Sequence, residues 1–229
     1  VGRARVLSIT EKFDHFIEEL DLVSEREIQL PAWVVRQPPA PGQKLRTVLM
    51  LADAGKDPLV AEGAIAAEFA RAGFLFCAAD VRGRGQCAPH PPARAPHYYA
   101  GRGEDFYVWN TLVLGRPMLG GFVWDALETL RALRARPDVD PSRMWIIGQG
   151  TMGVAALFAL ALDAGLRGGI VEGALAGYRS VVENAHYSAP FRVFLFGVLK
   201  QFDLPEVAAL AAPRPLLLLN PVDEAGRPA

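Results

Sequence analysis

The chain has 229 residues, 51% of them hydrophobic, and a formal net charge of −1. This length and hydrophobic content predict one globular domain with a sizeable core. The near-neutral charge argues against nucleic acid or an anionic membrane surface as a partner, and the lack of any run of about 18 apolar residues argues against a membrane span. No signal peptide is visible. Because the chain begins at Val1 rather than at methionine, we expect residues upstream, and localisation stays open.

The first predicted elements lie within 13–36, where two stretches alternate polar and apolar residues. They are typical of an antiparallel hairpin at the edge of a sheet. The continuous apolar run at 46–52 predicts a parallel strand covered on both faces. A helix is predicted over 61–73, and a second buried strand over 74–80.

A long loop rich in glycine, proline and arginine follows, and loops of this kind are usually functional. The remaining predicted elements are a helix (122–137), a strand (143–148), a helix (151–164), a strand (168–175), a helical or irregular insertion (178–210), and a last strand and turn (213–226). Strand–helix alternation from residue 46 onward predicts a mostly parallel sheet with helices on both faces. The functional site should then lie at the carboxyl ends of the strands.

The cysteines and histidines predict no metal site. Cys77 lies in an apolar run and is expected to be buried, whereas Cys87 lies in the long loop near His90. Two cysteines give neither metal-ligand spacing nor a disulfide framework, and we interpret Cys87 as a loop thiol rather than part of a catalytic dyad. No metal or other cofactor is predicted.

The most informative segment is 144–157, MWIIGQGTMGVAAL, which predicts a buried strand, a glycine turn and a small-residue helix. Such a turn carries the nucleophilic serine in the pattern G-x-S-x-G, but here Gly150 stands at the serine position. The bend forces positive φ, which costs a serine on the order of 1–3 kcal/mol and glycine almost nothing. Thr151, one residue late, is expected to supply a backbone N–H rather than a nucleophile.

The same glycines permit another interpretation. Gly148-x-Gly150-x-x-Gly153 matches the dinucleotide-binding pattern, and Glu172 lies near the offset of a ribose-binding acid. That pattern normally opens a βαβαβ half, yet two strand–helix units precede it here and one strong strand follows. A dinucleotide-binding protein therefore remains the less favoured alternative.

Taken together, these segments resemble the α/β-hydrolases, and among them bacterial acetyl xylan esterases and dienelactone hydrolase-like enzymes. The resemblance runs from about residue 30 to 226. It is carried by LADAGK, DVRGRGQ, LGRPMLGGFVWDALETLRAL, DVDPSRMWIIGQGTMGVAAL and PRPLLLLNPVDEAG. It implies the α/β-hydrolase fold, with the C-terminal strand and helix missing or truncated, in a single domain over 1–229. Either this domain is a fragment of a longer chain, or its sheet ends early.

The resemblance also implies roles for particular positions. Ala54 or Gly55 would give a backbone donor to the oxyanion hole, Gly150 would stand at the nucleophile position, and Asp223 would be the acid that orients a histidine. The D-x-R-G-x-G element from Asp80 to Gly85 would be structural.

In the family the histidine follows the acid, but this chain ends six residues after Asp223, and its histidines all precede it: His15, His90, His97 and His186. His186 is the one in a region that could cap the site, although a loop role is the simpler interpretation. Without serine and histidine, the nucleophile and base steps have no agent. The sequence therefore predicts a carboxylic-ester hydrolase homologue with impaired catalysis.

A second hypothesis is a non-catalytic carbohydrate-binding or structural domain that partners an active hydrolase domain, in the same polypeptide. Aromatic residues near the predicted site could stack on sugar rings: Tyr98, Tyr99, Phe106, Tyr107 and Trp109. Packing of the long loop onto the sheet is the simpler explanation for them. Under either hypothesis a small-molecule or carbohydrate ester is the expected ligand.

Overall fold

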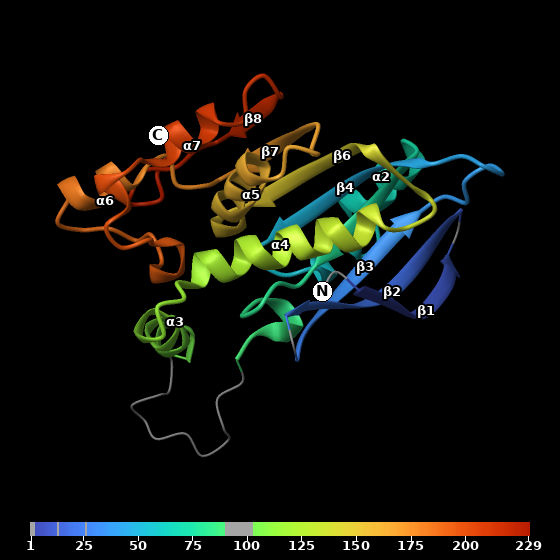
Figure 1. The fold of residues 1–229 in the computed structure, drawn as a ribbon, viewed down its shortest axis with the longest axis horizontal. Helices are drawn as coiled ribbons and strands as arrows, with labels where there is room; N and C mark the ends of the chain where they lie inside the picture. Colours follow the sequence, from blue (N-terminus) through green and yellow to red (C-terminus); the bar gives the residue numbers. More distant parts are fainter. Residues whose placement is uncertain (1–2, 13, 26, 90–102) are drawn as a thin grey trace, which may run out of the picture.

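The computed structural model describes residues 3–12, 14–25, 27–89 and 103–229. These residues form an eight-stranded sheet (Figure 1). Its strands are β1 (Arg3–Lys12), β2 (His15–Glu25), β3 (Ile28–Arg36), β4 (Leu45–Ala52), β5 (Phe74–Ala79), β6 (Val139–Gln149), β7 (Gly168–Glu172) and β8 (Leu216–Leu219). They lie in the order β1-β2-β3-β5-β4-β6-β7-β8. Pairing is antiparallel from β1 through β3 to β5 and parallel from β5 to β8.

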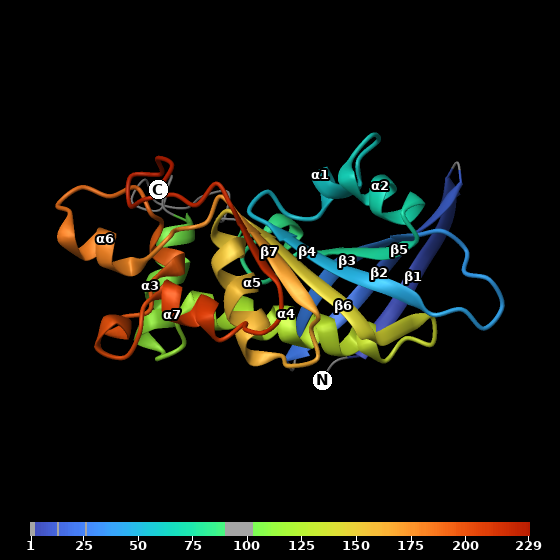
Figure 2. The same ribbon diagram turned by 90° about the horizontal axis from the view of Figure 1, so that it is seen from above.

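Helices cover both faces of the parallel part. They are α1 (Asp57–Val60), α2 (Ile65–Arg71), α3 (Gly103–Val113), α4 (Met118–Arg134), α5 (Thr151–Leu162), α6 (Tyr178–Glu183) and α7 (Leu204–Ala209), with 3₁₀ turns η1 (Gly85–Cys87), η2 (Phe191–Val193) and η3 (Val198–Lys200). Figure 2 shows α1 and α2 on one face and α4 and α5 on the other. The mostly parallel, doubly covered sheet predicted from the sequence is confirmed. None of the helices described is both long and apolar enough to cross a membrane.

The predicted hairpin within 13–36 forms as β2 and β3, but it does not lie at the edge of the sheet. β1 pairs with β2 and is the edge strand, so the prediction that the hairpin lies at the edge was wrong. The described side chains of β1 from Ala4 onward are all exposed. Because none of them enters the core, the strand lacks the apolar alternation by which a half-buried strand is recognised.

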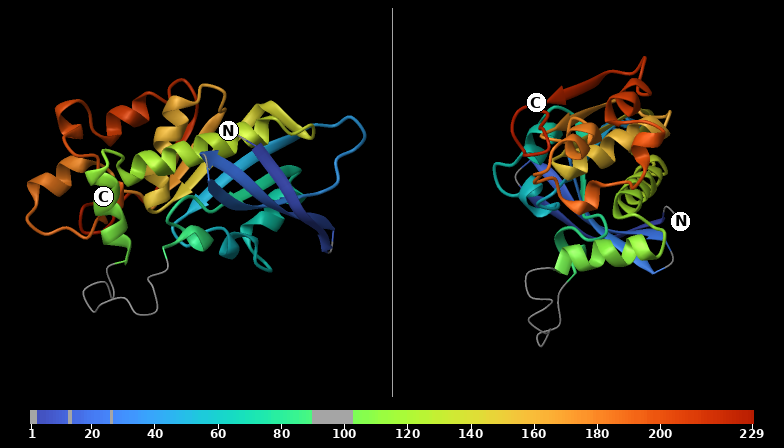
Figure 3. Two further views of the ribbon diagram at one scale, coloured as in Figure 1. Left: turned by 60° about the horizontal axis from the view of Figure 1, so that its bottom comes forward. Right: turned by 90° about the vertical axis from the view of Figure 1, so that its left-hand side faces the viewer.

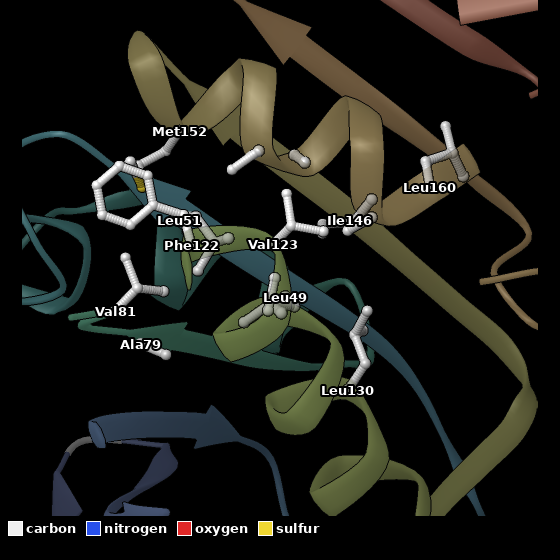
Figure 4. Close-up of a cluster of buried hydrophobic side chains, with 14 of the residues drawn as sticks. Leu49, Leu51, Ala79, Val81, Phe122, Val123, Leu130, Ile146, Met152 and Leu160 are labelled. Atoms are coloured by element: carbon white, nitrogen blue, oxygen red, sulfur yellow. The ribbon is translucent and has the colours of Figure 1, made fainter. Parts of the chain in front are cut away.

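The larger core lies between the sheet and helices α4 and α5. Helix α4 buries one stripe of apolar residues at helical spacing, which includes Phe122, Ala126, Leu130 and Leu133. Figure 4 shows Phe122 and Leu130 beside strand residues such as Leu49. Each such side chain stabilises the fold by about 1.5–3 kcal/mol on burial, so this core fixes α5, and with it the turn before α5, against the strand ends.

Two buried carboxylates hold the loop that follows β5. Asp80 accepts the backbone N–H groups of Lys56 (2.7 Å) and Gln86 (2.9 Å). Asp125, on α4, accepts the backbone N–H of Arg82 and its guanidinium, with Nη2 2.6 Å from Oδ1. The D-x-R-G-x-G element thus ties the loops at the carboxyl ends of β4 and β5 to α4.

The segment 178–210 contains α6, η2, η3 and α7 and lies at the same end of the molecule as α3 (Figure 3). Asp203 anchors it: its carboxylate accepts the backbone N–H groups of Tyr178 (2.6 Å) and Arg179 (3.0 Å) and also caps α7. The Tyr178 hydroxyl donates to the Val193 carbonyl at 2.6 Å. These contacts make the segment a packed cap at the carboxyl ends of the parallel strands.

Candidate functional site

The chain turns sharply from β6 into α5 at Gly150. Its backbone lies at φ 66° and ψ −131°, so the predicted positive φ is confirmed. Its N–H donates to the Glu172 carbonyl on β7 at 2.8 Å, which fixes the turn to the neighbouring strand. A glycine holds this conformation without the steric cost that a Cβ would bring.

Asp53 fills the space into which a side chain at position 150 would project. A Cβ added to Gly150 would lie 2.3 Å from Oδ2 of Asp53, well inside van der Waals contact. The same oxygen accepts the backbone N–H of Thr151 at 2.9 Å. Asp53 follows β4 directly, so the loop after one strand supplies a carboxylate that occupies the first turn of α5, the end of a helix that favours negative charge.

Arg192, from the cap, completes this cluster. Its Nε donates to Thr151 Oγ1 at 3.0 Å, and its Nη2 lies 3.7 Å from Oδ2 of Asp53. Thr151 Oγ1 in turn donates to Oδ1 of Asp53. The threonine hydroxyl therefore donates a hydrogen bond to a carboxylate and accepts one from a guanidinium.

A pocket of about 200 Å³ lies beside this cluster, and we call it the elbow pocket. Its lining comprises Asp53, Gly150, Thr151, Val154, Gly173, Leu175, Ser188, Ala189, Pro190, Arg192, Val193, Val222, Asp223 and Gly226. The structure thus brings together three positions singled out in the sequence, Gly150, Thr151 and Asp223. Their roles in binding or catalysis stay predictions.

Asp223 is held by the residues that follow it. Its carboxylate accepts the backbone N–H groups of Ala225 and Arg227, both at 2.9 Å, and Nε of Arg227 at 2.8 Å. The backbone hydrogen bond from Arg227, together with its guanidinium, lowers the pKa of Asp223 below its ordinary value. An arginine thus satisfies the carboxylate that the resemblance assigns to orienting a histidine.

The other predicted site residues lie in different places. The N–H of Gly55 donates to the Ala52 carbonyl at 3.0 Å within a tight turn, so in this conformation it does not point to the elbow pocket. His186 is exposed, and neither it nor His15 is among the residues that line the elbow pocket. Tyr98, Tyr99, His90 and His97 lie outside the described residues.

Among the described aromatic residues of the long-loop region, Trp109 packs against the cap. Trp109, on α3, is 49% exposed, and its ring centroid lies 5.4 Å from that of Phe191 on η2. Tyr107 is half-buried against the larger core, whereas Phe106 is exposed. Packing accounts for part of this aromatic group, and about half of Trp109 remains exposed near the cap.

Sequence reasoning did not single out Asp53 or Arg192. Asp53 could have been noticed, because it is the first polar residue after a buried parallel strand and so must lie at the switch point of the sheet. Arg192 had no such signal. It lies in the irregular cap segment, and the contact between it and Thr151 depends on how that segment folds back.

Comparison with known structures decides the fold. A protein from Bacteroides fragilis NCTC 9343 described as an acetyl xylan esterase superposes with a TM-score of 0.77 at 16% identity, covering 94% of this chain and 62% of that one. The chain has the α/β-hydrolase fold. A glucuronoyl esterase from Solibacter usitatus superposes with a TM-score of 0.63 at 15% identity, covering 94% of this chain and 67% of that one.

Sequence comparison gives a more limited match. A Bacillus subtilis (strain 168) protein that carries the name of a hydrolase, YtaP, is 27% identical over 130 residues, which is 56% of this chain and 44% of that protein. No protein-family model matches the chain. The chain spans less than half of this relative and just under two thirds of the Bacteroides fragilis protein. The resemblance to esterases of the α/β-hydrolase fold is thus confirmed as a likeness of fold.

Proposed function

We propose that the chain is a carboxylic-ester hydrolase homologue with impaired catalysis, whose elbow pocket binds a small ester or carbohydrate ester without efficient turnover. The fold it shares with acetyl xylan and glucuronoyl esterases supports the ester chemistry. The position of Asp53 against Gly150 and Thr151 supports the impairment.

Ester hydrolysis at such a turn needs an attacking oxygen and N–H groups that stabilise the negative charge on the carbonyl oxygen. Gly150 offers no attacking atom, and the Thr151 N–H is taken by Asp53. A negative charge that develops there would meet a carboxylate rather than a donor. Loss of one such donor alone typically costs about 10²–10³ in kcat.

Hydrolysis of p-nitrophenyl acetate by the purified protein tests this proposal. We expect no saturable turnover above that of buffer, and the same result for Thr151→Val, because the threonine is not the nucleophile. The proposal fails if the protein turns over at ordinary enzyme rates, roughly 1–1000 per second, and loses this activity on treatment with a serine-directed phosphonate or in Thr151→Val.

A second candidate function is that of a non-catalytic carbohydrate-binding domain that partners an active hydrolase domain. The partial exposure of Trp109 near the cap favours it, since indole rings stack on sugar faces. Xylo-oligosaccharides should then raise the melting temperature of the protein but not that of Trp109→Ala, whereas simple esters should shift both equally.

A rise in melting temperature with NADH instead would support the dinucleotide alternative. The position of Asp53 argues against this alternative, because its carboxylate lies where a pyrophosphate would need hydrogen-bond donors.

A further inference from the structure

The cap contains a second, partly open cavity, which is larger than the elbow pocket and has a different chemical character. Its volume is about 510 Å³, within the range of about 300–1,000 Å³ typical of small-molecule sites. Residues of α6, η2 and η3 and the segments between them line it. We call it the cap cavity.

Aromatic rings form one wall of the cap cavity. The ring centroid of Phe194 lies 6.4 Å from that of Tyr178, 5.8 Å from that of Tyr187 and 5.9 Å from that of Phe191. The Tyr178 hydroxyl is used by the Val193 carbonyl, and burial raises the pKa of this phenol, so it presents an uncharged ring. This wall offers apolar contact and little hydrogen bonding.

Large apolar side chains at the cavity are exposed. Val182 is 73% exposed, Phe196 67% and Leu199 38%. Apolar residues gathered at a concave site, rather than scattered singly, are a mark of binding surfaces. The partner that suits them is an apolar chain that can enter the cavity.

One charge accompanies these apolar groups. Lys200 lines the cavity, and it is the one charged residue among the described residues that line it. We propose that the cap cavity binds an amphipathic carboxylate, with its alkyl chain against the aromatic wall and its anionic head toward Lys200. A cationic amphiphile would find no partner for its head, and a neutral one would leave the ammonium unused.

This site is distinct from the elbow pocket, although the two share a wall. Along the segment 187–194, Tyr187, Phe191 and Phe194 line the cap cavity, whereas Ser188 and Arg192 line the elbow pocket. The proposal therefore does not depend on whether the elbow hydrolyses esters, and the two can fail separately.

Isothermal titration with a series of ligands tests the class of ligand. Hexanoate, octanoate and decanoate should bind with affinity that rises by about 2- to 4-fold per added methylene, because each buries more apolar surface. 1-Decanol should bind more weakly than decanoate, and decyltrimethylammonium more weakly still. Absence of saturable decanoate binding at about 1 mM, or equal affinity across the series, overturns the proposal.

Matched variants test the position of the ligand. Lys200→Gln should weaken decanoate binding about 2- to 5-fold and leave 1-decanol unchanged, as expected for a solvent-accessible ion pair. Lys44→Gln, at another exposed lysine, should change neither. Phe196→Ser should weaken both ligands, and Val113→Ser, at a residue 85% exposed, should weaken neither. Since these side chains are exposed, the variants should fold, which an unchanged melting temperature verifies.

Three outcomes contradict this assignment. If Lys200→Gln and Lys44→Gln change decanoate affinity equally, Lys200 does not bind the carboxylate head. Tighter decanoate binding in Asp53→Ala, with no effect of Phe196→Ser, places the ligand in the elbow pocket, because loss of the Asp53 carboxylate frees the Thr151 N–H there. Self-association in sedimentation that decanoate does not disperse, with no decanoate binding, identifies the apolar surface as a contact between copies.

Discussion

The carboxylate of Asp53 accepts the backbone N–H of Thr151 at 2.9 Å. Two strand ends of the sheet are joined by this bond, because Asp53 follows β4 and Thr151 follows β6 after one residue. The protein thus supplies its own anion at the first turn of α5, at a position where an external anion would otherwise be stabilised by the helix end.

Removal of this internal anion should open the position to an external one. In Asp53→Ala, the Thr151 N–H and the Arg192 guanidinium lose their carboxylate partner, so acetate should bind there and raise the melting temperature as its concentration increases. Thermal denaturation over an acetate series, at constant ionic strength, measures this.

Asp53→Asn is the matched control. Its amide oxygen can still accept the Thr151 N–H, so neither this variant nor the wild-type protein should respond to acetate. An equal response of all three proteins would show that acetate acts elsewhere.

Gly150→Ala should destabilise the fold severely. The substitution brings a Cβ to a residue at φ 66°, which costs on the order of 1–3 kcal/mol, and sets it 2.3 Å from Oδ2 of Asp53, which must move. Urea unfolding measures the resulting loss in the free energy of unfolding. Gly42→Ala is the control for backbone strain alone, since Gly42 has φ 76° with nothing within 4 Å of an added Cβ.

The double variant Asp53→Ala/Gly150→Ala separates strain from collision. It should recover the part of the loss that comes from the collision with Asp53, so that the two substitutions are not additive. Additive losses, or equal losses for Gly150→Ala and Gly42→Ala, would mean that Asp53 moves aside freely.

The turn at Gly150 was predictable because it is local. A buried strand, a glycine and a small-residue helix specify the bend within a dozen residues, and the mostly parallel sheet follows from the alternation of elements. The side chains that pack against the turn were not predictable in this way. They depend on a contact between residues 98 positions apart, Asp53 and Thr151, and on the folding of an irregular cap that delivers Arg192.

Asp125→Ala should cost about 3–5 kcal/mol of unfolding free energy, because it leaves the guanidinium of Arg82 without its main partner in a largely buried position. Arg116→Ala, which removes an arginine from the same network through Glu25, should cost at most about 1 kcal/mol, since the Arg116 side chain is 64% exposed. Urea unfolding compares the two. Similar losses would show that the network acts as one unit.

Asp138 should make stability depend on acid. Burial raises the pKa of its carboxyl, but the hydrogen bond from Arg136 and the charges of Arg136 and Arg36 outweigh this and hold the pKa below its ordinary value. Because the folded-state pKa is depressed, the stabilisation is present above the unfolded pKa and is lost as pH falls through the folded one. Wild-type stability should therefore decline below about pH 4–5.

Asp138→Asn removes this contribution. It should be about 1–2 kcal/mol less stable than wild type at pH 7, and the difference should shrink toward pH 2. Urea midpoints measured across this range give both values. Glu68→Gln is the control, because Glu68 is 72% exposed and pairs with Arg71 at the surface. A constant gap between Asp138→Asn and wild type would contradict the assignment.

The edge of the sheet shows the limit of sequence reasoning on the other side of the molecule. Residues 13–36 carry the apolar alternation of half-buried strands and were recognised, whereas β1 is held by its main-chain pairing with β2 and buries almost nothing of its own. A strand that contributes no side chains to the interior leaves no periodic trace in the sequence.

The kink at Gly150 keeps its form although no reactive atom projects from it. A glycine adopts this backbone geometry at little steric cost. The turn can therefore keep its conformation whether or not it carries a reactive side chain. A shared fold among distant chains therefore does not establish a shared chemistry, which has to be tested in each protein.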